Sequence, residues 1–160
     1  MDTELMSAGQ VLEEYQDDIR KLEVYLPWLI EKSQKRASQI YGQDGIATHS
    51  LPFPVFDSNL LRFVKEAEQT KFMDRNYLYV YSRYHLRNSS DEIALIHKTT
   101  IQQMNILGGI LSKYVLGGRT KARLWSMGVE EGVFLEAVQK AKELVDFWEN
   151  ATVHKSEDKG

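Results

Sequence analysis

The chain has 160 residues, of which 42% are hydrophobic and 27% are charged. This composition is that of a globular domain and excludes a disordered or collagen-like chain. The chain contains no cysteine, so disulfides and thiolate metal sites are excluded. Its longest uncharged apolar stretch, residues 99–112, is 14 residues long, whereas a membrane span needs about 20. The acidic N-terminus lacks the features of a secretory signal. We therefore expect a cytoplasmic protein with no membrane partner, comprising one domain over residues 1–150 and a flexible polar tail over 151–160.

The charges are unevenly distributed along the chain. The net charge is −5 over residues 1–61, +6 over residues 62–123 and −4 over residues 124–160. A basic centre between acidic ends is compatible with an anion-binding face. It is equally the pattern by which neighbouring helices of one bundle complement each other, which is the interpretation we adopt here.

Hydrophobic residues in the first part of the chain recur with heptad spacing over four heptads. This pattern predicts a long first helix over residues 7–41 with a narrow apolar seam. Pro27 lies within it and removes a backbone donor, so a kink or break is expected near Leu26. Gly42 is the expected end signal. The seam residues are Leu5, Ala8, Leu12, Tyr15, Ile19, Leu22, Leu26 and Leu29.

Residues 43–57 contain Pro52 and Pro54 among apolar side chains. We predict an ordered loop that is attached to the core. A second helix over residues 59–70 follows, with Asp57 or Ser58 as its N-cap.

Residues 72–86 are rich in tyrosine and fit two patterns. Alternation of Tyr77, Tyr79 and Tyr81 with other residues is typical of a strand, whereas other spacings fit a helix. No second alternating segment offers a pairing partner, so we predict a helix.

The residues Ser89-Ser90-Asp91-Glu92 have the spacing of a capping box, in which the Glu92 carboxylate reaches back to the Ser89 amide. A long helix over residues 90–116 is expected to follow and to stop at Gly117-Gly118. A short helix over 120–127, ended by Gly128, and a long last helix over 130–150 complete the prediction.

These elements predict an all-α fold, a bundle of five or six helices in which the first and last long helices pack against the helix over 90–116. The run from Ile110 to Val145, with its Gly-Gly-Arg turn and the short helix around Leu124-Trp125-Ser126-Met127-Gly128, resembles the C-terminal part of an uncharacterised bacterial domain family of unknown function. The resemblance covers under a quarter of the chain. It implies a small helical domain and supplies no catalytic residues.

Two basic groups are candidate binding residues. Arg119, Lys121 and Arg123 follow the glycine pair, where the amides of a helix start can bind a phosphate or carboxylate; the alternative is a helix end with a left-handed glycine. Neither a P-loop nor a dinucleotide fingerprint is present.

The second basic group is Arg75, Arg83 and Arg87, which lie among the tyrosines of residues 72–86. Arginines neutralise phosphates and tyrosine rings stack on unpaired bases, so this segment is the best candidate for nucleic-acid binding. The alternative is that the tyrosines pack in the core and the arginines face solvent, because no nucleic-acid-binding motif frames the segment.

Catalytic and metal sites are not predicted, and no cofactor is implied. The four histidines have no zinc-type spacing. His49 and Asp57 could form an acid/base pair, although no nucleophile accompanies them. Gly108-Gly109 lies inside a predicted helix and is expected to permit close approach of another backbone, such as the Pro27 kink, or a ligand. Glu13, Glu14, Asp17 and Asp18 are interpreted as a solvated acidic face.

The sequence thus favours a non-enzymatic interaction or regulatory module that forms a homodimer through its first helix. Two alternatives are a nucleic-acid-binding protein acting through the basic centre, and a small-molecule or anion-binding sensor or enzyme with Arg119 or Arg123 as the anchor.

Overall fold

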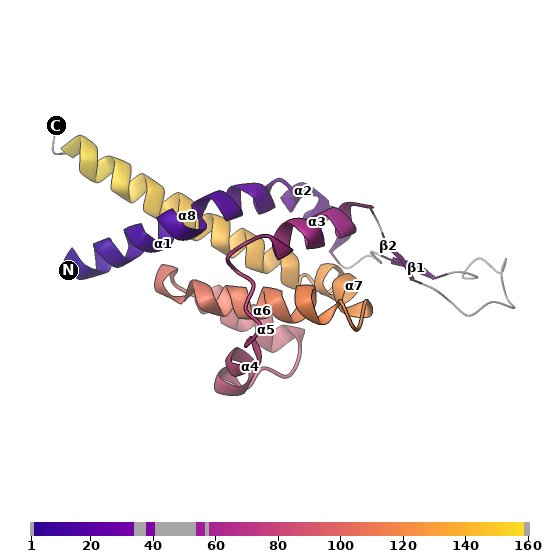
Figure 1. Ribbon diagram of the computed structural model, residues 1–160. Helices are drawn as coiled ribbons and strands as arrows, with labels where there is room; N and C mark the ends of the chain where they lie inside the picture. The colour runs from indigo at the N-terminus through magenta and orange to yellow at the C-terminus, as the bar shows by residue number, and fades with distance from the viewer. Residues whose placement is uncertain (1, 34–37, 41–53, 57, 159–160) are drawn as a thin grey trace, which may run out of the picture.

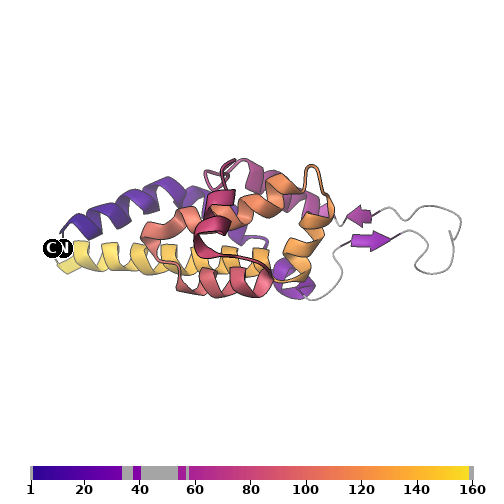
Figure 2. The ribbon, with the colours of Figure 1, turned by 90° about the horizontal axis from the view of Figure 1, so that it is seen from below.

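The computed structural model describes residues 2–33, 38–40, 54–56 and 58–158 (Figure 1). Within this part, eight α-helices and one 3₁₀ helix accompany two strands of three residues each. The all-α prediction is confirmed, although the described helices outnumber the five or six expected. Two long helices, α1 (Asp2–Glu23) and α8 (Val133–Asp158), run antiparallel and cross each other, so that the start of α1 and the end of α8 lie at the same end of the molecule but apart from each other (Figures 1 and 2).

The predicted first helix over residues 7–41 is divided. α1 ends at Glu23, and α2 (Leu26–Lys32) begins anew with Pro27 in its first turn. Proline costs no backbone hydrogen bond at this position, because the first amides of a helix have no intrahelical acceptor. The expected break near Leu26 is therefore confirmed, whereas the expected continuation of the helix to residue 41 is wrong, because α2 ends at Lys32 and Ser38–Ile40 forms a strand.

The two strands pair with each other. β1 (Ser38–Ile40) and β2 (Pro54–Phe56) are antiparallel, with Gln39 opposite Val55. They lie at the end of the molecule opposite the chain termini (Figure 2). The predicted loop over 43–57 thus contains a strand in its last part, while residues 43–53, including His49, and Asp57 lie outside the described residues.

The next two helices agree with the predictions. α3 (Ser58–Glu68) corresponds to the helix expected over 59–70, and α4 (Leu78–Tyr84) shows that the tyrosine-rich segment is helical at its centre. α4 ends where His85 adopts a left-handed conformation with φ of 55°.

The helix predicted over residues 90–116 consists of three elements. α5 (Ser89–Lys98) ends where Thr99 is extended, and η1 (Ile101–Gln103) leads into α6 (Met104–Gly117). Thr100 and Gln103 form a capping box that starts the new segment. Threonine side chains compete for backbone hydrogen bonds, and two in succession favour a break over helix continuation.

The final helices have different ends from those expected. Gly128 does not terminate the short helix, because α7 (Arg123–Glu130) continues past it and Gly132 with φ of 79° makes the turn. A Cβ on Gly128 would lie 2.5 Å from the Phe134 ring, so this glycine serves close packing. α8 continues to Asp158, so residues 151–158, expected to be a loose tail, are helical.

The core lies between the α1–α8 pair and the other helices. The first-helix seam is buried inside the chain at Ala8, Leu12, Ile19 and Leu22. On α6, Gly108 and Gly109 permit the predicted close approach, but the neighbours are the Phe72 carbonyl and Val80, each 2.6 Å from a hypothetical Cβ, and not the Pro27 break. None of the described helices combines the length and apolar character needed to cross a bilayer.

Candidate functional site

A buried carboxylate joins three helices. Glu92 on α5 is fully buried and accepts hydrogen bonds from the hydroxyls of Tyr81 on α4 and Tyr114 on α6, the latter at 2.6 Å. The Lys113 ammonium lies 3.4 Å from the same carboxylate and 4.8 Å and 5.0 Å from the centroids of the two tyrosine rings. We call these four residues the Glu92 cluster. Because a buried carboxylate is costly without partners, the cluster fixes α4 and α6 to α5.

The cluster shifts the titration of both phenols. Burial, and then the charge of Glu92 and the hydrogen bond to it, raise the pKa of Tyr81 above its ordinary value near 10. Burial and the hydrogen bond to Glu92 raise the pKa of Tyr114 in the same direction. Both phenols therefore act as hydrogen-bond donors and not as bases. This arrangement is structural, because its polar atoms bind one another.

The capping box predicted at Ser89 and Glu92 is wrong. The N-cap of α5 is Asn88, whose side-chain oxygen accepts a hydrogen bond from the Asp91 amide at 3.0 Å. Because the N-cap is Asn88 and not Ser89, the Glu92 side chain does not bond to the helix start. It points into the core instead, where it pairs with Tyr81 and Tyr114.

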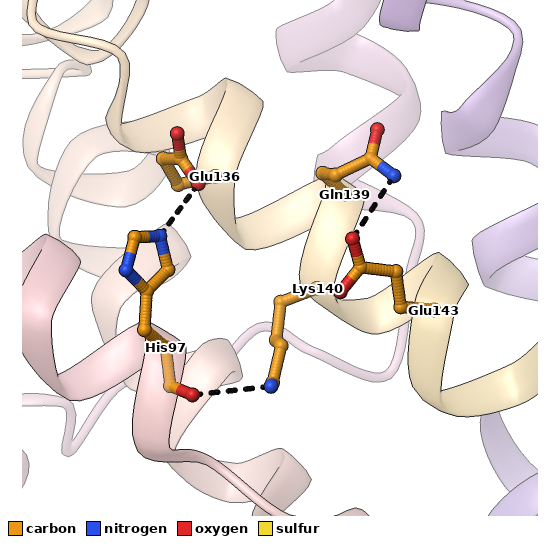
Figure 3. A pocket seen from close by; sticks show the side chains of 5 residues that line it. All are labelled: His97, Glu136, Gln139, Lys140 and Glu143. Atoms are coloured by element: carbon orange, nitrogen blue, oxygen red, sulfur yellow. Dashed lines mark hydrogen bonds and ion pairs between the residues drawn. The ribbon is translucent and has the colours of Figure 1, made fainter. Parts of the chain in front are cut away.

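A surface hollow lies between the end of α5 and the outer face of α8 (Figure 3). His97 Nε2 lies 2.8 Å from Glu136 Oε2, and Lys140 Nζ donates to the His97 carbonyl oxygen at 3.1 Å. Gln139 donates to Glu143 at 3.4 Å. We call this the α8 hollow, and its volume of about 210 Å³ is below the 300 Å³ or more that is typical of small-molecule sites.

The outer face of α8 also carries an aromatic side chain. Phe147 is 63% exposed and its ring packs edge-on against Trp148 at a centroid distance of 5.4 Å. The opposite edge of α8 meets α1 through a charged network, in which Arg20 lies 3.0 Å from Asp146 and 2.6 Å from Glu149. Phe147 therefore lies on the part of the α1–α8 pair that no described helix covers.

One of the three basic residues after the glycine pair has an acidic partner within the chain. Arg119 is paired with Glu68 at 3.2 Å, while Lys121 and Arg123 are exposed. Gly118 is not left-handed, since its φ is −66°. It is needed because the Trp125 indole lies against it and donates to the Val115 carbonyl at 2.9 Å. The helix thus ends at the glycine pair as predicted, but the predicted left-handed glycine conformation is wrong.

The tyrosine-rich segment does not present a row of free rings. Tyr81 is held in the Glu92 cluster, and the Tyr79 hydroxyl accepts from Asn105 at 3.0 Å. Arg83 lies 5.7 Å from the centroid of the Tyr84 ring. Arg75 and Arg83 are exposed, and Arg87 forms a 3.4 Å pair with Asp91. Of these tyrosines Tyr79 is 41% exposed, so the segment offers cations beside one exposed ring and not the series of stacking platforms typical of single-strand binding.

The acidic group on α1 is not entirely solvated. Glu13, Glu14 and Asp17 are exposed as predicted, but Asp18 is buried and accepts from the Lys71 amide at 2.8 Å. This bond satisfies a backbone amide in the turn after α3. Within the described residues, no group of three or more histidine, aspartate or glutamate side chains could hold a metal ion.

Comparison with known proteins finds no match to a protein family, a curated protein or a solved structure. The resemblance over residues 110–145 therefore stays a prediction.

Sequence reasoning missed both the Glu92 cluster and the α8 hollow. The local pattern assigned Glu92 to a helix cap. Its two tyrosine partners lie 11 and 22 residues away in the sequence, so a local pattern could not reveal its role in the core. The hollow combines α5 with α8, 39 residues apart. The signal available in the sequence was Phe147, an aromatic residue off the buried face of the last helix.

Proposed function

We propose that the chain is a cytoplasmic, non-enzymatic interaction or regulatory module that self-associates as a homodimer. The observation that carries the proposal is the α1–α8 pair, which extends beyond the other helices (Figures 1 and 2) and presents the 63% exposed ring of Phe147 on α8. Aromatic side chains that are exposed on a monomer and buried on association supply much of the binding energy of protein interfaces.

The contact surface that we propose lies on α8 and differs from the first-helix seam expected from the sequence. The α1 seam residues Ala8, Leu12, Ile19 and Leu22 are buried within the chain, where α1 packs mainly against α8, so they are not available to a partner. A two-helix pair leaves the outer faces of both helices uncovered, and a second pair from another copy would complete a four-helix arrangement. The outer face of α8 therefore replaces the seam as the proposed surface.

Self-association is tested by sedimentation velocity and light scattering from low to high micromolar concentrations. We expect a reversible change from the monomer mass of 18.5 kDa to twice that mass. A mass that stays monomeric at high micromolar concentration would contradict the proposal. The nucleic-acid alternative is tested alongside with single- and double-stranded oligonucleotides, since phosphate contacts must weaken steeply with added salt.

A further inference from the structure

The α8 hollow and Phe147 lie on one face of one helix. Lys140, which lines the hollow, and Phe147 are seven residues apart, so they lie within about 20° of each other around a helix of 3.6 residues per turn. Their separation along the axis is about 10 Å at 1.5 Å per residue. α8 thus carries a hollow and an exposed apolar side chain two turns apart.

We propose that the α8 hollow of one copy receives Phe147 of a second copy. This inference rests on the proposed self-association and names its interface. If two α8 helices meet antiparallel with a two-fold axis close to Glu143, each Phe147 comes opposite Lys140 of the other copy. Both contacts form at once, which is the self-complementary arrangement that a two-fold interface requires.

The hollow has room for a phenyl ring, and one of its lining residues is a cation. Its volume is about 210 Å³, and an engineered protein cavity of about 150 Å³ accommodates benzene. His97 already pairs with Glu136, and Gln139 with Glu143, so these four side chains keep one partner each when a ring enters. The Lys140 ammonium at the edge offers a cation for the ring face.

The charges around the hollow complement those of a second copy. Lys140 and Glu143 lie on the same face as Phe147, and Glu143 is exposed. In the antiparallel pairing, Lys140 of each copy comes within reach of Glu143 of the other. Two such attractive pairs form for the one close approach of two Glu143 carboxylates at the axis, so the charges favour the proposed register.

Crosslinking tests the register directly, because the natural chain has no cysteine. In the proposed dimer, residue 143 lies beside its symmetry mate, whereas the two copies of residue 150 lie about 20 Å apart along the axis. We expect Glu143→Cys to give a covalent dimer with a short bismaleimide reagent, and Asn150→Cys, also exposed, to give little. Equal crosslinking of both variants, or of neither, would overturn the register.

Substitution tests the contact energy. Phe147→Glu is expected to weaken self-association at least tenfold, while the matched control Leu78→Glu, which replaces a 68% exposed side chain on α4, leaves it unchanged. Gln139→Trp, which fills the hollow from its rim, is expected to act like Phe147→Glu. Circular dichroism checks that each variant is folded.

A charge exchange separates specific pairing from general stickiness. Lys140→Glu and Glu143→Lys should each weaken the dimer, and the double variant should recover it, since the opposite charges then meet again. A wild-type monomer overturns this inference together with the proposed function. A wild-type dimer that is insensitive to Phe147→Glu and Gln139→Trp overturns this interface and leaves the proposed function standing.

Discussion

Removal of the Glu92 carboxylate is the perturbation whose cost the structure defines best. In Glu92→Ala, the hydroxyls of Tyr81 and Tyr114 lose their acceptor within the protein. An unsatisfied buried donor costs about 1–3 kcal/mol. The Lys113 side chain is 32% exposed and can turn to solvent, so its loss adds little. With two such donors left unsatisfied, we expect the free energy of unfolding to fall by about 2–6 kcal/mol.

Urea unfolding at neutral pH, followed by circular dichroism, measures this change. Glu92→Gln keeps the shape and one acceptor oxygen, so it should cost less, about 1–2 kcal/mol, because a charge-assisted bond becomes a neutral one. Glu13→Ala, at an exposed position on α1, serves as the control and should stay within about 0.5 kcal/mol of the wild type.

A double-mutant cycle then assigns the effect to the contact. Glu92→Ala combined with Tyr114→Phe should show a coupling energy of about 0.5–3 kcal/mol, because each change removes the same hydrogen bond. If Glu92→Ala unfolds at the same urea concentration as Glu13→Ala, or if the coupling is zero, the Glu92 cluster does not hold α4, α5 and α6 together.

Two further predictions concern glycines and alkaline pH. Gly9→Ala on α1 should stabilise the protein by about 0.5–1 kcal/mol in thermal or urea unfolding, because nothing lies within 4 Å of the added Cβ. Gly108→Ala should destabilise the protein despite the same gain in helix propensity, because the added Cβ would lie 2.6 Å from the Phe72 carbonyl oxygen. Equal effects of the two substitutions would contradict this packing. The raised pKa values of Tyr81 and Tyr114 mean that the native state retains protons that the unfolded chain loses above about pH 10. The contribution of these two tyrosines to the free energy of unfolding should therefore be fully present below pH 10 and decline above it by about 1.4 kcal/mol per pH unit for each tyrosine. Tyr114→Phe should reduce the steepness of this decline in a pH series of urea titrations.

The glycine pairs show how far local sequence signals reached. Gly117-Gly118 correctly marked the end of a helix, since α6 ends at Gly117. The expected left-handed conformation did not occur, because the reason for glycine at position 118 is the indole of Trp125, which arrives from the next helix. The glycine pair thus located the helix end, while the reason for a glycine at position 118 is a tertiary contact that the local pattern does not contain.

The same distinction explains the errors in helix boundaries. The break before Pro27 was predicted correctly, because the missing amide excludes proline from a helix interior but not from the first turn of a new helix. The break at Thr99 and Thr100 was missed, because two threonines only weaken a helix and the apolar periodicity continues across them.

Helical periodicity was sufficient to determine the all-α class, because a pattern of 3.6 residues defines a buried face for each helix on its own. Tertiary structure alone decided which face found a partner within the chain. The described aliphatic seam residues of α1 are buried within the chain, Glu92 turns inward to two distant tyrosines, and Phe147 stays exposed. Periodicity shows that a helix has an apolar side, but the packing of the other helices determines how much of that side is left for a partner.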